Sequence, residues 1–304
     1  METVKERFTH HLQRMQDLIC GSLEQEDGSA CFSEDSWQRP GGGGGRTRIL
    51  QEGSVFEKAG VNFSEVYGEI TPPLRSQLQL AGSSFFATGL SIVIHPLNPF
   101  VPTTHANVRY FELYDEQGEC CDRWFGGGID LTPYYLFADD CVHFHRTLKA
   151  CCDRSGPDLY PRLKKQCDEY FVNIHRGREA RGVGGIFFDH CRPGNGSTAA
   201  FWLDFTEECS RSFLPAYLPI VDRRKNIPYT PRHRTWQEIR RGRYVEFNLM
   251  YDRGTLFGLK TGGRTESILM SLPPAVRFQY NHVPEPGSEE EKLVTILKNP
   301  VDWA

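Results

Sequence analysis

The sequence predicts an α+β fold with a mostly antiparallel sheet. Segments with strand character and segments with helix character come in separate clusters along the 304 residues, and no strict β-α-β alternation occurs. Neither an internal repeat nor a change in composition marks a linker. We therefore predict a single domain over residues 1–304, although this chain length would also allow two small domains.

The N-terminal elements follow from apolar spacing and from one run of glycines. Val4, Phe8, Leu12, Met15 and Ile19 recur at helical spacing, so the chain is expected to open with an amphipathic helix. Five consecutive glycines at 41–45 are expected to connect a hairpin formed by residues 31–39 and 46–50.

Later elements are assigned in the same way. Helices are expected over 139–152, 158–176 and 198–220, with a shorter one over 236–241. Extended segments are expected over 85–95, 105–113, 183–190 and 244–251.

Composition excludes some classes of protein. Hydrophobic residues at 39% and charged residues at 24% are typical of a globular protein. A net charge of −4 argues against a dedicated nucleic-acid binder. No apolar run is long enough to span a bilayer, so no integral membrane association is expected. The first 25 residues mix acidic with basic residues and lack the apolar centre of a signal peptide, which favours a cytoplasmic location.

Ten cysteines are present, but no CxxC occurs, which removes the usual zinc and thioredoxin signatures. A chain of this length does not need a disulfide framework. Most of the cysteines, including the adjacent pairs 120–121 and 151–152, are therefore interpreted as reduced and mainly as packing residues.

The segment 105–113 carries the clearest functional pattern. Side chains alternate between the faces of a strand, so His105, Asn107 and Arg109 share one face with the apolar Phe111 and Leu113. Such a face suits the floor of a pocket for a ligand with carboxylate and apolar parts. The solvent-facing side of an antiparallel sheet is the alternative interpretation.

Two further segments contain candidate residues. Three glycines precede Asp130 and would let the backbone approach a flat ligand closely; a helix-entry turn is the alternative. Arg253 and Arg264 lie in a second glycine-containing stretch and offer forked donors for carboxylates. Either arginine could instead form a structural ion pair.

Helical spacing predicts which of the histidines on helices are buried and which are exposed. On the 139–152 helix, His145 aligns with apolar residues and is expected inside, whereas His143 is expected in solvent. His175 is expected to face inward as well. His95, His105, His145 and His175 could converge on a metal, but separated histidines are weak evidence for a metal site, and core histidines with satisfied hydrogen bonds are the favoured interpretation of most of them.

Together these segments resemble oxygen-dependent coproporphyrinogen III oxidase. The resemblance is carried by residues 95–109, 124–133 and 244–274, begins at 55–62 and extends to Trp303. It implies a broad antiparallel sheet with helices on both faces and a homodimer formed through the C-terminal part. It also implies oxidative decarboxylation of the ring A and B propionates of coproporphyrinogen III to vinyl groups, which gives protoporphyrinogen IX, CO2 and H2O2 in haem biosynthesis.

The resemblance further assigns residues. It implies His105 as a proton donor, the four histidines above as doubtful ligands of a divalent metal, and O2 as co-substrate without an organic cofactor. The positions that it implies for substrate binding are Ser91, Asn107, Val108, Arg109, Gly262, Gly263 and Arg264.

The residues themselves are compatible with that chemistry. Several propionates require several arginines, which Arg109, Arg253 and Arg264 supply. Asp130 is our candidate base for a pyrrole N–H, and a carboxylate would need a dry site for that task. Two rival interpretations remain: a non-catalytic tetrapyrrole carrier, which would not need Asp130 and His105, and a metal-dependent oxygenase.

Overall fold

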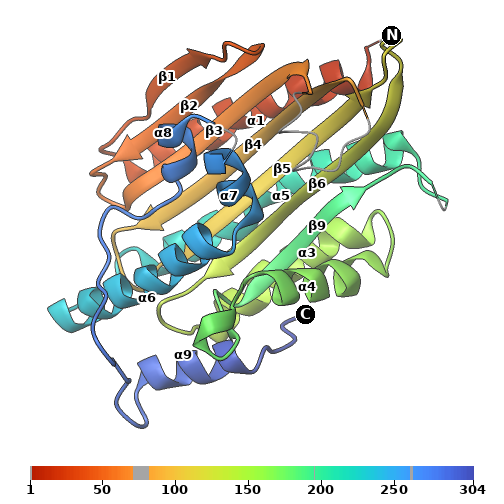
Figure 1. The fold of residues 1–304 in the computed structure, drawn as a ribbon. Coiled ribbons are helices and arrows are strands. Elements are labelled where there is room, and N and C mark those ends of the chain that lie inside the picture. The colour runs from red at the N-terminus through yellow and green to blue at the C-terminus, as the bar shows by residue number, and fades with distance from the viewer. Residues whose placement is uncertain (1, 71–81, 195, 261–262) are drawn as a thin grey trace.

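A seven-stranded antiparallel sheet dominates the computed structural model, which describes residues 2–70, 82–194, 196–260 and 263–304 (Figure 1). Its strand order is β1-β2-β3-β4-β5-β6-β9. The strands are β1 (Ser33–Gln38), β2 (Gly43–Gln51), β3 (Phe56–Glu69), β4 (Ser84–Pro96), β5 (Thr103–Tyr114), β6 (Cys120–Thr132) and β9 (Gly184–Cys191). A small ladder pairs β7 (Val172–Asn173) with β8 (Glu179–Ala180).

Helices lie on both faces of this sheet (Figure 1). One face packs on α1 (Val4–Asp27) and α5 (Ala199–Arg224), and the other is partly covered by α6 (Pro231–Met250), α7 (Arg253–Lys260) and α8 (Thr265–Leu269). Beside the edge strand β9 lie α3 (Ala138–Asp153) and α4 (Leu159–Tyr170), and α9 (Glu289–Lys298) contacts β8. The predicted α+β class with an antiparallel sheet is confirmed.

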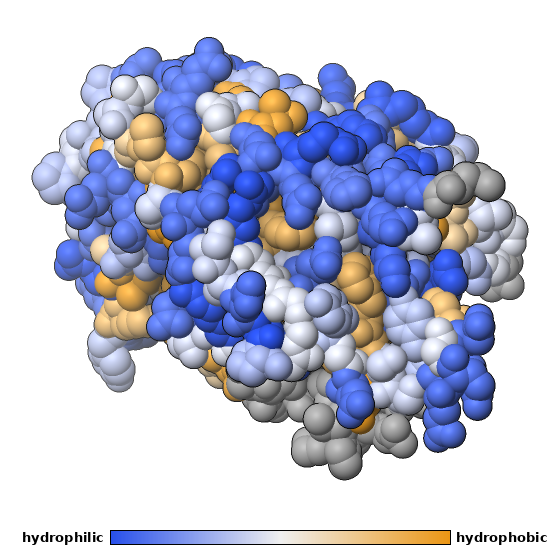
Figure 2. Space-filling view, turned by 90° about the horizontal axis from the view of Figure 1, so that it is seen from above, coloured by the Kyte–Doolittle hydropathy of each residue, from blue (hydrophilic) through white to orange (hydrophobic). Residues whose placement is uncertain are grey.

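The two faces of the sheet differ in polarity as the alternation predicted. Ala106, Val108 and Tyr110 of β5 are buried against the α1 and α5 layer, where Phe8 meets the Tyr110 ring edge-on at 6.3 Å. His105, Asn107 and Arg109 point the other way and are only partly buried. Seen from above, the surface is largely hydrophilic with smaller apolar patches (Figure 2). In the described ranges no helix has the length and apolar character to cross a bilayer.

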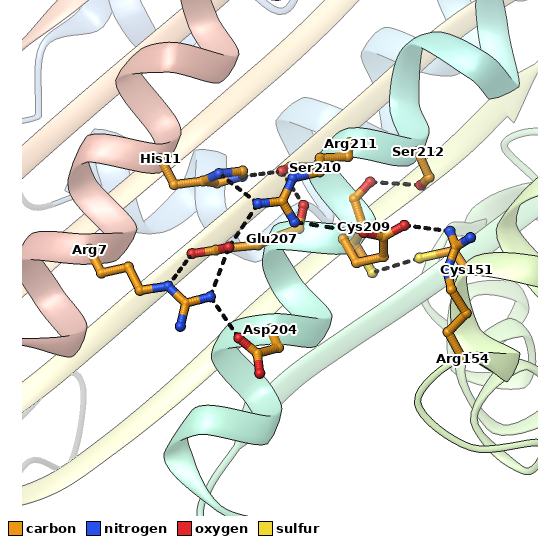
Figure 3. A network of polar contacts seen from close by, with 11 residues as sticks. Arg7, His11, Cys151, Arg154, Asp204, Glu207, Cys209, Ser210, Arg211 and Ser212 are labelled. Carbon is orange, nitrogen blue, oxygen red and sulfur yellow. Dashed lines mark hydrogen bonds and ion pairs between the residues drawn. The ribbon is translucent and has the colours of Figure 1, made fainter.

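A polar network joins α1 to α5 at the edge of the core (Figure 3). Arg7 lies 2.6 Å from Asp204 and 3.0 Å from Glu207, and Nε2 of His11 lies 2.7 Å from Oγ of Ser210. Burial lowers the pKa of His11 to about 4, so its ring is neutral near pH 7. The network fixes the helix pair without an uncompensated buried charge.

Two predicted elements are wrong. The expected strand 244–251 is helical, because α6 runs on to Met250 and buries Tyr244, Phe247 and Asn248 at helical spacing. The expected helix 158–176 ends at Tyr170, where Phe171 and Val172 favour extended backbone and lead into the β7–β8 ladder.

Two smaller expectations also need correction. The 41–45 glycines are only partly a turn, since β2 begins at Gly43. His143 is not simply solvated: its Nε2 donates to the carbonyl of Pro215 at 3.1 Å. That carbonyl lacks its usual helical donor because the residue four positions later is Pro219.

Cysteines carry no disulfide in the described ranges, which include all ten. Six of them are buried, and Cys31 and Cys121 are exposed.

Asp27, at the end of α1, organises the junction with β3. Its side chain is 5% exposed and accepts hydrogen bonds from the backbone N–H groups of Ser29, Ala30, Ser54, Val55 and Phe56. Burial alone would raise its pKa, but the donors, Phe56 foremost, hold the pKa of Asp27 below its ordinary value.

We therefore expect Asp27→Asn to destabilise the fold, because an amide nitrogen cannot accept from these N–H groups. The expected loss at pH 7 is about 2–4 kcal/mol in the free energy of unfolding, measured by urea denaturation. The folded-state pKa is depressed, so the difference from wild type should shrink as pH falls below about 4. Asp17→Asn, on the exposed side of the same helix, should cost below about 1 kcal/mol; equal losses would contradict the assignment.

Candidate active site

A cavity of about 250 Å³ lies on the polar face of the sheet, between the strands and the α6–α8 segment. Its floor is set by strand register: Ser91 of β4 pairs with Asn62 of β3 on one side and with Asn107 of β5 on the other. Directly paired residues point to the same face. Three strands therefore present one transverse row of polar side chains.

The neighbouring row contains glycines on both sides of Arg109. Gly89 of β4 and Gly126 of β6 pair with it, and a Cβ on Gly126 would lie 3.3 Å from Cγ and Nε of Arg109. The glycines of 126–128 are thus part of strand β6, not of the helix-entry turn that the sequence left as the alternative. The missing side chain of Gly126 leaves space for Arg109.

Arg109 is a partly buried cation. Its Nη2 donates a hydrogen bond to Oδ1 of Asn107 at 3.3 Å. Among the residues that the structure describes, no carboxylate lies within ion-pair distance of this guanidinium. Such a group is suited to bind an anionic ligand in the cavity.

His105 lies on the same strand face, one row further along, and belongs to a buried chain of charged groups. Its Nδ1 donates to Oδ1 of Asp130 at 2.8 Å, and Nη2 of Arg181 donates to both Asp130 oxygens at 2.7 and 2.6 Å. Because Nδ1 carries the proton, Nε2 can accept, and the amide of Asn107 lies 3.4 Å from it. His105 lines the cavity, so it can exchange a proton there.

Asp130 itself is withdrawn from the cavity. The residue is 1% exposed and does not line the cavity, whereas we expected its carboxylate to meet the ligand; its part in the reaction stays a prediction. Burial alone would raise its pKa, yet the charge of Arg181 and the His105 hydrogen bond hold the pKa of Asp130 below its ordinary value. A carboxylate stabilised in this way is a poor base. Its hydrogen bond with Nδ1 of His105 instead orients the His105 ring.

Asp252, at the start of α7, supplies a second carboxylate, and this one lines the cavity. Its Oδ1 accepts from the hydroxyl of Tyr170 at 2.9 Å and its Oδ2 from the N–H of Thr255 at 2.7 Å. Burial opposes ionisation, but the Thr255 N–H and the nearby His105 keep the pKa of Asp252 below its ordinary value.

The roof of the cavity is tied to the sheet by hydrogen bonds. Nε2 of His95 donates to the carbonyl of Ser271 at 2.8 Å, Thr47 contacts Ser267 at 3.0 Å, and the Lys58 ammonium donates to Leu272 O at 2.8 Å. Burial holds the pKa of His95 well below its ordinary value, so this ring is neutral. These contacts hold the roof over the polar row.

The predicted binding residues fall into two groups. Ser91, His105, Asn107 and Arg109 line the cavity together, and so does Val108, which contributes backbone because its side chain is in the core. Others are not part of the lining: Arg253 pairs with Asp189 at 3.4 Å, Arg264 pairs with Asp35, and Gly263 lies between α7 and α8. Gly262 lies outside the described residues.

The four candidate metal-ligand histidines have separate partners. Besides His95 and His105, His145 is buried between the Tyr160 hydroxyl and the Val183 carbonyl. His175, expected inside, is instead exposed and bonds to Glu246 and Tyr251, because α4 ends before it. Within the described ranges no three His, Cys, Asp or Glu side chains gather as a metal would require, so these histidines do not fit a shared ligand set.

Sequence reasoning missed Arg181, Asn248 and Asn62. Arg181 lies in a stretch with several arginines, and nothing in its spacing separates it from the exposed ones. Asn248 was hidden by the wrong strand assignment of 244–251. Asn62 lies on β3, and only the sheet register places it beside Ser91.

Comparison with known proteins gives the chain its family. A family model described as coproporphyrinogen III oxidase matches residues 7–303. A relative from Glycine max, named oxygen-dependent coproporphyrinogen-III oxidase, chloroplastic, is 51% identical over 311 residues, which cover 99% of this chain and 80% of the relative. Because the match spans almost the whole sequence, including the strands that build the cavity, this chain belongs to the coproporphyrinogen III oxidase family.

Proposed function

We propose that this chain catalyses the oxygen-dependent oxidation of coproporphyrinogen III to protoporphyrinogen IX in haem biosynthesis. Each of two propionic acid groups reacts as R–CH2–CH2–COOH + O2 → R–CH=CH2 + CO2 + H2O2. The 51% identity to an oxygen-dependent relative supports the reaction. In the structure, the proposal is supported mainly by Arg109, which has no carboxylate partner among the described residues. It lines the same cavity as His105, the proposed proton-transfer group.

In this proposal Arg109 binds the reacting propionate, and Ser91 and Asn107 hydrogen-bond to polar atoms of the same ring. Nε2 of His105 accepts or returns a proton as the pyrrole is oxidised and the peroxide forms. Asp252 is the remaining candidate base because its carboxylate also lines the cavity. Asp130 acts through His105. Electrons pass from the electron-rich reduced tetrapyrrole to O2.

The size of the cavity bears on how the substrate is held. At about 250 Å³ it lies below the range of roughly 300–1,000 Å³ that is usual for whole small-molecule ligands. We infer that it receives one pyrrole ring with its propionate, while the rest of the macrocycle lies at the mouth.

We also propose that the chain forms a homodimer. The segment 271–288, which has no helix or strand, exposes Phe278 by 62%, Tyr280 by 97% and Val283 by 73%. Arg277 anchors this segment to α6 through Glu238. Exposed apolar side chains that are held in place suit an interface with a second copy. The cytoplasmic location stays a prediction, since the relative named above is chloroplastic.

Arg109→Ala should weaken substrate binding by about 2–4 kcal/mol, because a desolvated propionate loses its cation. Fluorescence titration with the porphyrin analogue of the substrate would measure this loss. Arg253→Ala and Arg264→Ala serve as comparisons: both arginines already have aspartate partners, so each should cost less than about 1 kcal/mol. Substrate contact by Arg253 or Arg264 would instead show as a loss equal to that of Arg109→Ala.

Turnover should require O2 and no added flavin or nicotinamide, because the substrate supplies the electrons. An oxygen electrode with purified protein and coproporphyrinogen III would show O2 uptake, and the vinyl product would be followed in parallel. We expect the protein to remain active after chelation, when it contains well below one metal ion per chain. Product formation under strict anaerobiosis would refute the O2 requirement. Activity restored only by one specific metal would refute the expectation that activity survives chelation.

Sedimentation should report about twice the 34.7 kDa chain mass for the wild type. Phe278→Asp combined with Tyr280→Asp should give a monomer, because two charges would have to be buried in the interface. Leu18→Asp, which changes a side chain 55% exposed on α1, should leave the dimer intact. A dimer that withstands the double change would place the interface elsewhere.

A further inference from the structure

Arg181 lies at the other end of the charged chain from His105, also lines the cavity, and has an unusual environment for a cation. Its side chain is 2% exposed. The guanidinium lies 4.0 Å from the Phe171 ring centre and 4.8 and 4.9 Å from those of Tyr244 and Phe247. Three aromatic rings, one from the residue that follows α4 and two from α6, thus fix its position.

The hydrogen bonds of Arg181 connect two walls of the site. Nη2 holds both oxygens of Asp130 on β6, and Nη1 donates to Oδ1 of Asn248 on α6 at 3.0 Å. Asn248 lines the cavity. Arg181 therefore sets the distance between the sheet that carries His105 and the helix that bears part of the roof.

The charge of Arg181 is needed as well as its shape. An ionised carboxylate that is 1% exposed is strongly unfavourable without a counter-charge. With Arg181 present, Asp130 stays ionised and accepts the Nδ1 proton of His105, which leaves Nε2 toward the cavity. Without the cation, Asp130 would lose the partner that fixes both its charge and its orientation.

We propose that Arg181 is a positioning residue for the reaction: through Asp130 it holds the His105 ring with Nε2 directed at the substrate. The proposal rests on the function proposed above and deepens it. Arg181 lines the cavity, but both terminal nitrogens of its guanidinium are already bonded to Asp130 and Asn248. In this role its loss therefore affects the rate of the chemical step and leaves substrate affinity nearly unchanged.

The test uses chemical rescue of Arg181→Ala. Removing the side chain opens a space beside the cavity, lined by Asp130 and the aromatic rings, into which a free guanidinium ion fits. We expect kcat to fall by about 10²-fold or more with KM changed little, and added guanidinium to restore at least about 10-fold. Urea has the same shape without the charge and should restore nothing. Both solutes are used far below denaturing concentrations.

Arg240→Ala provides the matched control. Arg240 is also buried, at 4% exposure, and pairs with Glu179 at 2.7 Å, but it has no bond to Asp130 or His105. Its variant should show no rise in kcat with guanidinium. If Arg181→Ala does not fold, Arg181→Lys keeps the charge but not the bridge to Asn248, and should lower kcat at constant KM.

The outcomes separate the two proposals. A wild-type protein without turnover would remove the proposed function. A normal kcat in the Arg181→Ala variant, an effect confined to KM, no rescue by guanidinium, or equal rescue by guanidinium and urea would overturn the positioning role while the function stands. In Arg181→Lys, an unchanged kcat would do the same.

Discussion

A buried carboxylate imposes the strictest requirement on this structure. Asp130 lies on β6, next to the edge strand β9, at 1% exposure, where an unpaired charge would cost several kcal/mol. Arg181 meets that requirement from the β8–β9 connection, and His105 meets it from β5. This one carboxylate connects several parts of the structure. The cavity floor contacts Asp130 through His105, and α6 contacts Arg181 through Asn248.

Two packing features accommodate the charged residues of the site. The glycines of β6 leave the polar face free of side chains beside Arg109, so a charged residue can occupy a sheet that is otherwise close-packed. The aromatic rings of Phe171, Tyr244 and Phe247 enclose the Arg181 guanidinium and exclude water from the pair. Because water is excluded, the electrostatic hold on Asp130 is strong, and the His105 ring has one favoured orientation.

Sequence patterns predict the parts of this arrangement that depend on one element at a time. The period-2 alternation of 105–113 gave the polar face of β5, and helical spacing gave α1. What the sequence could not reveal depends on contacts between elements far apart in the chain. In 244–251 the apolar Val245, Phe247 and Leu249 alternate with the polar Glu246 and Asn248, which favours a strand. Only packing against Arg181 distinguishes the helix. The orientation of Asp130 was missed for the same reason, because its partner is 51 residues away.

The arginines of the chain show how a functional cation differs from a structural one. Arg181, Arg240 and Arg241 are buried, and each has a carboxylate partner, so their charges are already compensated in the folded protein. Arg109 is partly buried, yet the described residues offer it only the amide oxygen of Asn107. Its incomplete compensation costs stability in the empty protein, and an anion in the cavity removes that cost. The position therefore favours anionic ligands, whereas an added carboxylate partner in the protein would abolish the preference. The same criterion explains why Arg253 and Arg264, which looked equivalent to Arg109 in sequence, are not equivalent in the structure.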